Sequence, residues 1–134
     1  MIFTPENWCK DAADGLEATF QDYSADQVCA AVTRGSWNLW RCWNSERGTG
    51  VALRLIPCGW LVTENQAPVA FLWSYQGRDS CEMISSYMEI AKLQGCNLLR
   101  FNTKHKGLHR LFKRFEPMLI CELGGVKTYE IRVH

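Results

Sequence analysis

The chain has no long apolar segment. No stretch approaches the roughly 18 to 20 consecutive apolar residues that a transmembrane helix requires. The N-terminal residues, MIFTPENWCKDAADG, also lack the basic start and the long apolar core of a secretion signal. We therefore expect a soluble, cytoplasmic protein that makes no contact with a membrane.

Closely spaced metal ligands are also absent. The seven cysteines are scattered, so their spacing fits neither a zinc site nor a disulfide framework, and we expect reduced, mostly buried thiols. His105 and His109 are four residues apart on a predicted helix, but no carboxylate or cysteine lies at ligand spacing. A solvated basic face is the favoured interpretation, and we predict no metal. The cysteines are Cys9, Cys29, Cys42, Cys58, Cys81, Cys96 and Cys121.

The net charge of +1 conceals an uneven distribution. Acidic residues gather in the first segment: Glu6, Asp11, Asp14, Glu17, Asp22 and Asp26. A basic run in the second half comprises Arg100, Lys104, Lys106, Arg110, Lys113 and Arg114. This run is compatible with a nucleic-acid-binding module or with a solvated helix face. Phe112 and Phe115 fall on an apolar stripe rather than among the basic residues, so base stacking is not supported.

At 134 residues with 12% aromatic side chains, the chain is long enough for one domain with its own core, which we place at 1–134. The region 67–115 predicts a strand, a tight turn, a helix, a strand and a helix. Residues 67–75 (APVAFLWSY) form a nearly continuous apolar run, as in a strand buried on both faces. Gln76 and Gly77 break that run. A helix follows with Asp79 or Ser80 as its cap and an Asp-x-x-Glu capping box.

That helix carries apolar residues at three- and four-residue spacing and ends at Gly95; they are Met83, Ile84, Tyr87, Met88 and Ala91. A second strand at 96–102 and a short helix at 108–115 follow, so the two strands should be parallel. The remaining predictions are two short helices within 11–34, strands at 36–44, 51–56 and 60–63 with a bulge near Pro57 and Gly59, and a hairpin of 118–123 and 126–133.

This order of elements, with Asn102 and Arg110-Leu-Phe-Lys-Arg-Phe115, resembles the GNAT (GCN5-related N-acetyltransferase) superfamily over nearly the whole chain. The resemblance implies an α+β (α/β) domain with a mixed, mainly antiparallel sheet and helices on both faces. It also implies that 67–75 and 96–102 splay apart, and that acetyl-coenzyme A is the cofactor.

In that family the turn after the buried strand usually reads Arg/Gln-x-x-Gly-x-Gly/Ala, and its amides hold the pyrophosphate of the coenzyme. Here Gln76 matches, but Asp79 and Cys81 replace the two small residues. The aspartate would repel a pyrophosphate, and Arg78 would offset part of that repulsion. The residues that the resemblance implies for coenzyme binding are Trp73, Ser74, Gln76, Gly77, Arg78, Asp79, Ser80, Cys81, Asn102 and Phe112.

Two catalytic roles of the family lack their usual residues. Phe112 stands where a tyrosine often acts as general acid, and phenylalanine has no proton to donate. The buried strand carries no carboxylate to act as general base, although Glu64 lies just before it. Cys81 at a helix N-terminus is a candidate nucleophile. The weak catalytic candidates are therefore Glu64, Cys81 and His105.

A narrower resemblance concerns Asn102-Thr103-x-His105 followed by Arg110-x-x-Lys113. It is similar to a region of small GNAT-like internal virion proteins of short-tailed bacteriophages, which are associated with capsid cores or virion assembly. This resemblance implies virion or assembly proteins as partners, and a location in the host cytoplasm or in the virion.

The sequence is compatible with three functions. The first is a degenerate acyltransferase fold that serves as a structural or binding component of a phage virion, because Asp79, Cys81 and Phe112 replace residues that the chemistry uses. The second is an active acetyl-coenzyme A-dependent N-acyltransferase, in which proximity supplies much of the rate of attack by an amine. The third and weakest is nucleic-acid binding. An enzyme should have an open cleft at 76–81, whereas a structural protein should have side chains filling it.

Overall fold

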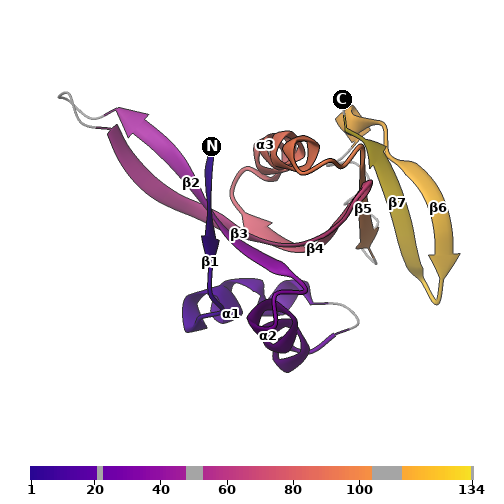
Figure 1. Cartoon of the computed structure of the whole chain (residues 1–134), viewed down its shortest axis with the longest axis horizontal. Helices are drawn as coiled ribbons and strands as arrows, with labels where there is room; N and C mark the ends of the chain where they lie inside the picture. The colour runs from indigo at the N-terminus through magenta and orange to yellow at the C-terminus, as the bar shows by residue number, and fades with distance from the viewer. Residues whose placement is uncertain (21–22, 48–52, 104–112, 134) are drawn as a thin grey trace.

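The computed structural model describes residues 1–20, 23–47, 53–103 and 113–133. Within those ranges seven strands form one sheet in the order β1-β2-β3-β4-β5-β7-β6 (Figure 1). Neighbouring strands run antiparallel except β4 and β5, which run parallel. The strands are β1 (Ile2–Glu6), β2 (Asn38–Arg47), β3 (Leu53–Gln66), β4 (Val69–Gly77), β5 (Leu98–Thr103), β6 (Met118–Leu123) and β7 (Val126–Arg132).

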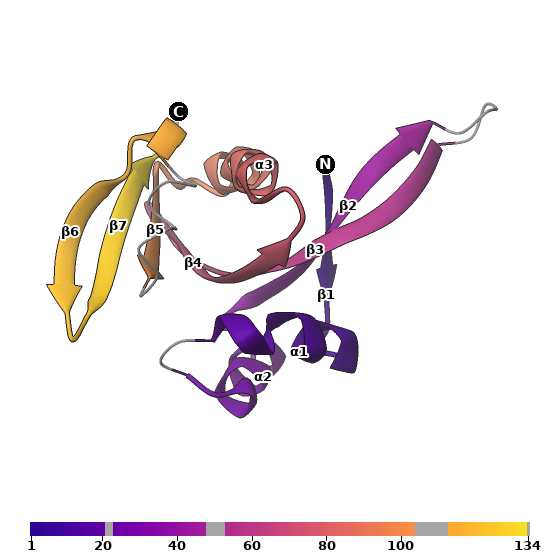
Figure 2. The same cartoon turned by 180° about the vertical axis from the view of Figure 1, so that it is seen from behind.

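Helices cover both faces of the sheet, as predicted. Among the described residues they are α1 (Lys10–Leu16), α2 (Ala25–Thr33), α3 (Ser80–Leu93) and the short 3-10 helices η1 (Glu17–Thr19) and η2 (Lys113–Phe115). The two views show α3 on one side of the sheet and α1 with α2 on the other (Figures 1 and 2). No helix in the described ranges has both the length and the apolar character needed to cross a membrane.

Each helical layer buries its own apolar core against the sheet. The five apolar α3 residues that the sequence places on one stripe are all buried, and they pack with Leu61, Leu99 and Ile131 of the strands. On the opposite face, Leu16 and Val28 of the α1–α2 layer pack with residues of β2 and β3. The helical period of 3.6 residues therefore predicted the α3 side of the core correctly.

The C-terminal hairpin and the bulge in β3 are confirmed. Gly124 and Gly125 connect β6 and β7 with φ angles of 58° and 81°, which glycine adopts without strain. In β3, the register with β2 shifts opposite Cys42 and Trp43, so that Cys58 is the extra residue of a bulge. The two strands expected at 51–56 and 60–63 are consequently parts of one continuous strand, Leu53–Gln66.

Three expectations about local structure are wrong. The pattern did not predict β1, an edge strand that pairs only with β2 and therefore tolerates Pro5. Gln76 and Gly77 do not end β4; they continue it by pairing with Trp60 and Gly59 of β3.

The capping box expected at Asp79 is also absent. Asp79 is the N-cap of α3, but its side chain makes no cap hydrogen bond, because its backbone (φ −126°, ψ 72°) departs from the extended N-cap conformation. A capping box occurs instead at Ser24 of α2. Most of the helix predicted at 108–115 lies outside the described residues, which resume with η2 at Lys113.

Candidate functional site

β4 and β5 pair over only four residues and then separate. Their parallel register runs from Val69 opposite Leu98 to Leu72 opposite Phe101. Beyond Leu72, β4 remains paired with β3 as far as Gly77. The splay predicted between these strands is therefore present, and it opens one edge of β4 where a parallel partner would otherwise lie.

A cleft of about 330 Å³ occupies this separation and reaches the first turn of α3. Its described lining residues come from η1, β4, β5 and the start of α3: Ala18, Thr19, Leu72, Trp73, Ser74, Tyr75, Gln76, Gly77, Ser80, Phe101 and Asn102. Both its volume and its position beside the carboxyl end of a strand are typical of small-molecule sites. The cleft is open, as the enzyme interpretation expects at this place.

A second bulge shapes the wall of the cleft. The register between β3 and β4 shifts so that Thr63 faces Leu72 and Val62 faces Ser74, which leaves Trp73 as the extra residue. A bulge turns two successive side chains toward the same side of a sheet. Trp73 accordingly stacks on Trp37, and the Ser74 hydroxyl lies 2.7 Å from the Tyr23 hydroxyl, on the side of α2.

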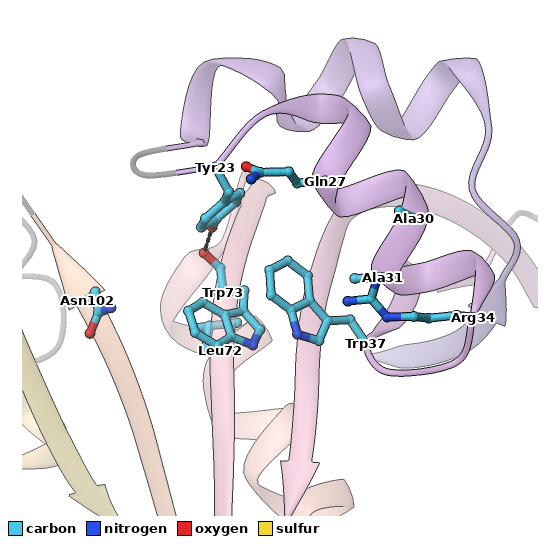
Figure 3. Close-up of a pocket in the computed structure, with 9 residues that line it drawn as sticks. All are labelled: Tyr23, Gln27, Ala30, Ala31, Arg34, Trp37, Leu72, Trp73 and Asn102. Atoms are coloured by element: carbon cyan, nitrogen blue, oxygen red, sulfur yellow. Dashed lines mark hydrogen bonds between the residues drawn. The ribbon is translucent and has the colours of Figure 1, made fainter.

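Tyr23 ties the loop before α2 to this bulge. Its hydroxyl donates a hydrogen bond to the main-chain carbonyl of Trp73 (Figure 3). A phenol has one hydrogen to donate, so the Ser74 hydroxyl is the donor in their contact. The sequence analysis missed Tyr23 because it lies in an interhelical loop without any motif, and only the fold brings it to β4.

Two facing glycines bring β3 and β4 close together at the end of the cleft. A Cβ added to Gly59 would lie 2.2 Å from the carbonyl oxygen of Gln76, and one added to Gly77 would lie 2.9 Å from that of Cys58. Neither position has room for a side chain. Gly77, which the resemblance assigned to the coenzyme, thus has a structural role that is independent of any ligand.

The start of α3 has the geometry of an anion site but carries an acidic residue. The backbone amides in the first turn of a fourteen-residue helix attract negative charge, and the Asp79 side chain makes no hydrogen bond that caps them. Asp79 is itself exposed to solvent. Arg78 does not line the cleft; it borders a separate hollow with Met1 and Glu82.

The fold brings six of the residues suggested for coenzyme binding into the cleft: Trp73, Ser74, Gln76, Gly77, Ser80 and Asn102. Arg78, Asp79 and Cys81 are not among its described lining residues, and Phe112 lies outside the described residues, as does His105. The Glu64 carboxylate accepts a hydrogen bond of 3.2 Å from the indole nitrogen of Trp73, so it holds that ring in place.

Burial raises the pKa of a tyrosine that lines the cleft and of one buried thiol of β2. Burial, assisted by the nearby Cys81 thiol, raises the pKa of Tyr75 to about 12, so its hydroxyl stays protonated at neutral pH. Burial likewise raises the pKa of Cys42 well above its usual range. Both groups are therefore neutral under physiological conditions.

Two arginines of the basic run contact other residues of the protein, whereas Lys113 is exposed. Arg100 forms a 2.7 Å salt bridge with Glu130 of β7, and its guanidinium lies 5.5 Å from the centre of the Phe71 ring. Arg114 lies over the Phe115 ring at 4.8 Å. Lys104, Lys106 and Arg110 lie outside the described residues.

No protein-family model and no curated protein sequence matches this chain. Solved acetyltransferase structures do match its fold. A Bacillus subtilis acetyltransferase in complex with CoA superposes with a TM-score of 0.69 at 13% identity, over 98% of both chains. The ribosomal-protein-S18-alanine N-acetyltransferase of Escherichia coli gives 0.63 at 8% identity, over 98% of this chain and 94% of its own.

A Desulfovibrio desulfuricans protein described as an acetyltransferase of the GNAT family gives a TM-score of 0.64 at 12% identity, over 99% of both chains. These likenesses extend over nearly the whole of each chain at low sequence identity. The chain therefore has the fold of the GNAT acetyltransferases, a mixed α+β sheet flanked by helices.

Proposed function

We propose that the protein is an acyl-coenzyme A-dependent N-acyltransferase that transfers an acyl group to an amine. The observation that supports this most directly is the open cleft of about 330 Å³ between the separated ends of β4 and β5. A structural protein without a coenzyme has no need of such a cleft, whereas an enzyme requires one to admit its cofactor.

The lining of the cleft suits the narrow arm of a coenzyme A thioester. The main chain of β4 from Ser74 to Gly77 forms one wall, and Phe101 with Asn102 of β5 forms the other. The first turn of α3 would receive the phosphates, with Ser80 at the mouth of the cleft. Asp79 opposes that charge from an exposed position, where solvent screens its effect. When bound there, an acyl-coenzyme A supplies an activated thioester carbonyl.

The chain itself would position the reactants and move the proton. As the amine nitrogen forms a bond to the carbonyl carbon, the carbon–sulfur bond breaks, the nitrogen loses a proton and the sulfur gains one. Tyr75 lines the cleft, so its hydroxyl is the candidate proton donor to sulfur although position 112 is a phenylalanine; its raised pKa makes it a weaker acid than an ordinary tyrosine. Ser74 also lines the cleft, and its hydroxyl lies 2.7 Å from the Tyr23 hydroxyl.

The alternative is the degenerate fold that serves as a virion or assembly component with protein partners. The substitutions at Asp79, Cys81 and Phe112 favour it. Nucleic-acid binding has less support, because Arg100 is paired with Glu130. Strong retention on DNA at low salt, lost as salt rises, would support that third function.

Calorimetric titration with acetyl-coenzyme A, and with desulfo-coenzyme A as the control, tests the proposal. We expect acetyl-coenzyme A to bind with a dissociation constant in the micromolar range. When the protein, acetyl-coenzyme A and an acceptor amine are combined, mass spectrometry should detect the acetylated amine. Absence of heat at millimolar ligand would reject the enzyme and leave a scaffold, whose partner a pull-down would then identify.

A further inference from the structure

A second cavity adjoins the cleft and lies between α2 and the sheet. Its volume is about 580 Å³, within the range of small-molecule sites (Figure 3). Leu72, Trp73 and Asn102 line both spaces, so a molecule in this cavity would lie against the same bulge as the contents of the cleft. This cavity is therefore where an acceptor could meet the acyl group.

One wall of the cavity consists of ordered aromatic rings. The indoles of Trp37 and Trp73 stack with a centroid separation of 4.8 Å and an interplanar angle of 17°. Phe71 stacks on the other side of Trp73 at 5.7 Å, and Tyr23 meets both indoles edge-on. The Glu64 carboxylate further fixes the Trp73 ring through its indole nitrogen. Both faces of Trp73 are covered by these neighbours, so a ligand meets a rigid aromatic wall and not a free Trp73 face. Such a wall favours a flat ring over a flexible chain, because its own rings are already ordered.

The opposite wall is one face of α2. Gln27, Ala30, Ala31 and Arg34 recur at three- and four-residue spacing from α2 to its C-cap, and all four line the cavity. The two alanines in the middle leave room above the indoles, while the polar side chains stand at the ends of the row. A row of small residues with a polar residue at each end suits a planar ligand that carries polar substituents.

Arg34 gives this cavity its charge preference. It is the only charged residue among the described lining residues, and none of the described carboxylates forms a salt bridge with it. Its Nε donates a 2.9 Å hydrogen bond to the Ser36 hydroxyl, which restrains the guanidinium. A guanidinium that is already positioned favours planar anions such as carboxylates. Figure 3 shows Arg34 and Asn102 at opposite ends of the cavity, with the two indoles between them.

We propose that this cavity binds a small arylalkylamine, in which the amine is attached to an aromatic ring through a methylene group or a short chain, and that this ligand also carries an anionic group. The ring lies along Trp37 and Trp73, the anion contacts Arg34, and the amine points toward Asn102 and the cleft. This assignment rests on the proposed acyltransferase function for the acceptor role of the ligand, but the ligand class follows from the cavity itself. Aliphatic polyamines suit this cavity less well, since they have no aromatic ring and carry positive charges that Arg34 would repel.

Three small amines separate the contributions of ring and charge. Para-aminomethylbenzoate has a flat ring and a carboxylate, benzylamine has the ring alone, and tranexamate has the carboxylate on a saturated ring. Calorimetry and tryptophan fluorescence on the full chain without coenzyme should rank para-aminomethylbenzoate about tenfold tighter than each of the other two.

Variants then assign these differences to residues. Arg34→Gln should abolish the higher affinity for para-aminomethylbenzoate over benzylamine. The affinity for benzylamine itself should stay within about twofold of its wild-type value. Arg54→Gln, an exposed arginine near the start of β3, is the matched control and should change nothing. Trp37→Leu should weaken both aromatic ligands. Ala30→Phe fills the cavity from an exposed helix position, so it tests the site if Trp37→Leu fails to fold.

The outcomes distinguish this inference from the proposed function. Equal affinity for the three amines, no binding of any of them, or an unchanged ranking in Arg34→Gln would overturn the ligand class, whatever acetyl-coenzyme A does. If para-aminomethylbenzoate binds as expected but acetyl-coenzyme A does not, the acyltransferase proposal fails and the ligand class stands. If both bind, mass spectrometry should detect N-acetylated para-aminomethylbenzoate; its absence would overturn the acceptor role.

Discussion

The hydroxyl of Tyr23 donates a hydrogen bond to the main-chain carbonyl of Trp73, the residue that bulges from β4. This contact joins residues fifty positions apart in the chain. It connects the loop before α2 to the wall that the two cavities share. The relative position of α2 and β4 therefore depends in part on a single phenol.

Replacing Tyr23 by phenylalanine should lower the free energy of unfolding by about 1 to 3 kcal/mol, because the partly buried carbonyl of Trp73 and the Ser74 hydroxyl both lose a partner. Urea denaturation measures this change. Ser74→Ala is the control, since it removes only the contact between the hydroxyls and should cost less. If Ser74→Ala costs as much as Tyr23→Phe, the bond to the Trp73 carbonyl contributes little.

Gly59→Ala should destabilise the fold severely, by roughly 3 kcal/mol or more, because the new Cβ would lie 2.2 Å from the Gln76 carbonyl oxygen. Gly35→Ala serves as the comparison. Gly35 has a φ of 81° and no atom near the added Cβ, so only backbone strain of about 1 to 2 kcal/mol is expected. Thermal denaturation of the two variants gives the ranking, and similar losses would contradict the close approach of β3 and β4.

Asp79→Asn should strengthen binding of acetyl-coenzyme A by about tenfold at low salt, because it removes a negative charge from the first turn of α3. Stability should change little, since the carboxylate makes no cap hydrogen bond. Asp26→Asn makes the same charge change in the first turn of α2 and should leave the affinity unaltered. Calorimetry at low and high salt measures both variants. Unchanged or weaker binding by Asp79→Asn would place the phosphates elsewhere.

Stability should fall in alkaline solution. Burial raises the pKa of Tyr75 from 10.0 to about 12, and it raises the pKa of the Cys42 thiol from 9.0. The unfolded chain would then release these protons at lower pH than the folded chain, so their contribution is complete below about pH 9 and is lost as pH rises toward 12. Denaturation measured across this pH range should show that the free energy of unfolding declines less steeply with pH for Tyr75→Phe than for the wild type. Equal slopes would mean that Tyr75 titrates normally.

Local patterns predicted much of the fold. The period of the α3 residues identified the helix and its buried face, and the apolar run before it identified β4, whose parallel pairing with β5 follows from the helical crossover. The paired glycines identified the hairpin of β6 and β7. The pattern missed β1, because five residues containing Pro5 carry little strand signal and the contacts of this strand, its pairing with β2 and the packing of Phe3 against the core, come from distant parts of the chain.

The candidate site was predictable only in part. Gln76, Gly77 and Ser80 lie where an apolar strand is followed by a helix, so their place beside the cleft could be proposed from position alone, although Gln76 and Gly77 belong to β4 and not to a turn. Tyr23, Trp37 and Arg34 belong to no motif. Their meeting with Trp73 depends on how α2 crosses the sheet, and distant contacts of this kind leave no periodic trace in a sequence.

The sequence by itself determined most of the elements, their order and the face that α3 buries, because these follow from the spacing of apolar side chains within short segments. Only the tertiary structure decided that β4 and β5 separate beyond Leu72, that Trp73 bulges, and that Arg34 stands at the end of an aromatic cavity. These features arise from strand register and from packing between segments far apart in the chain, and no local propensity encodes them.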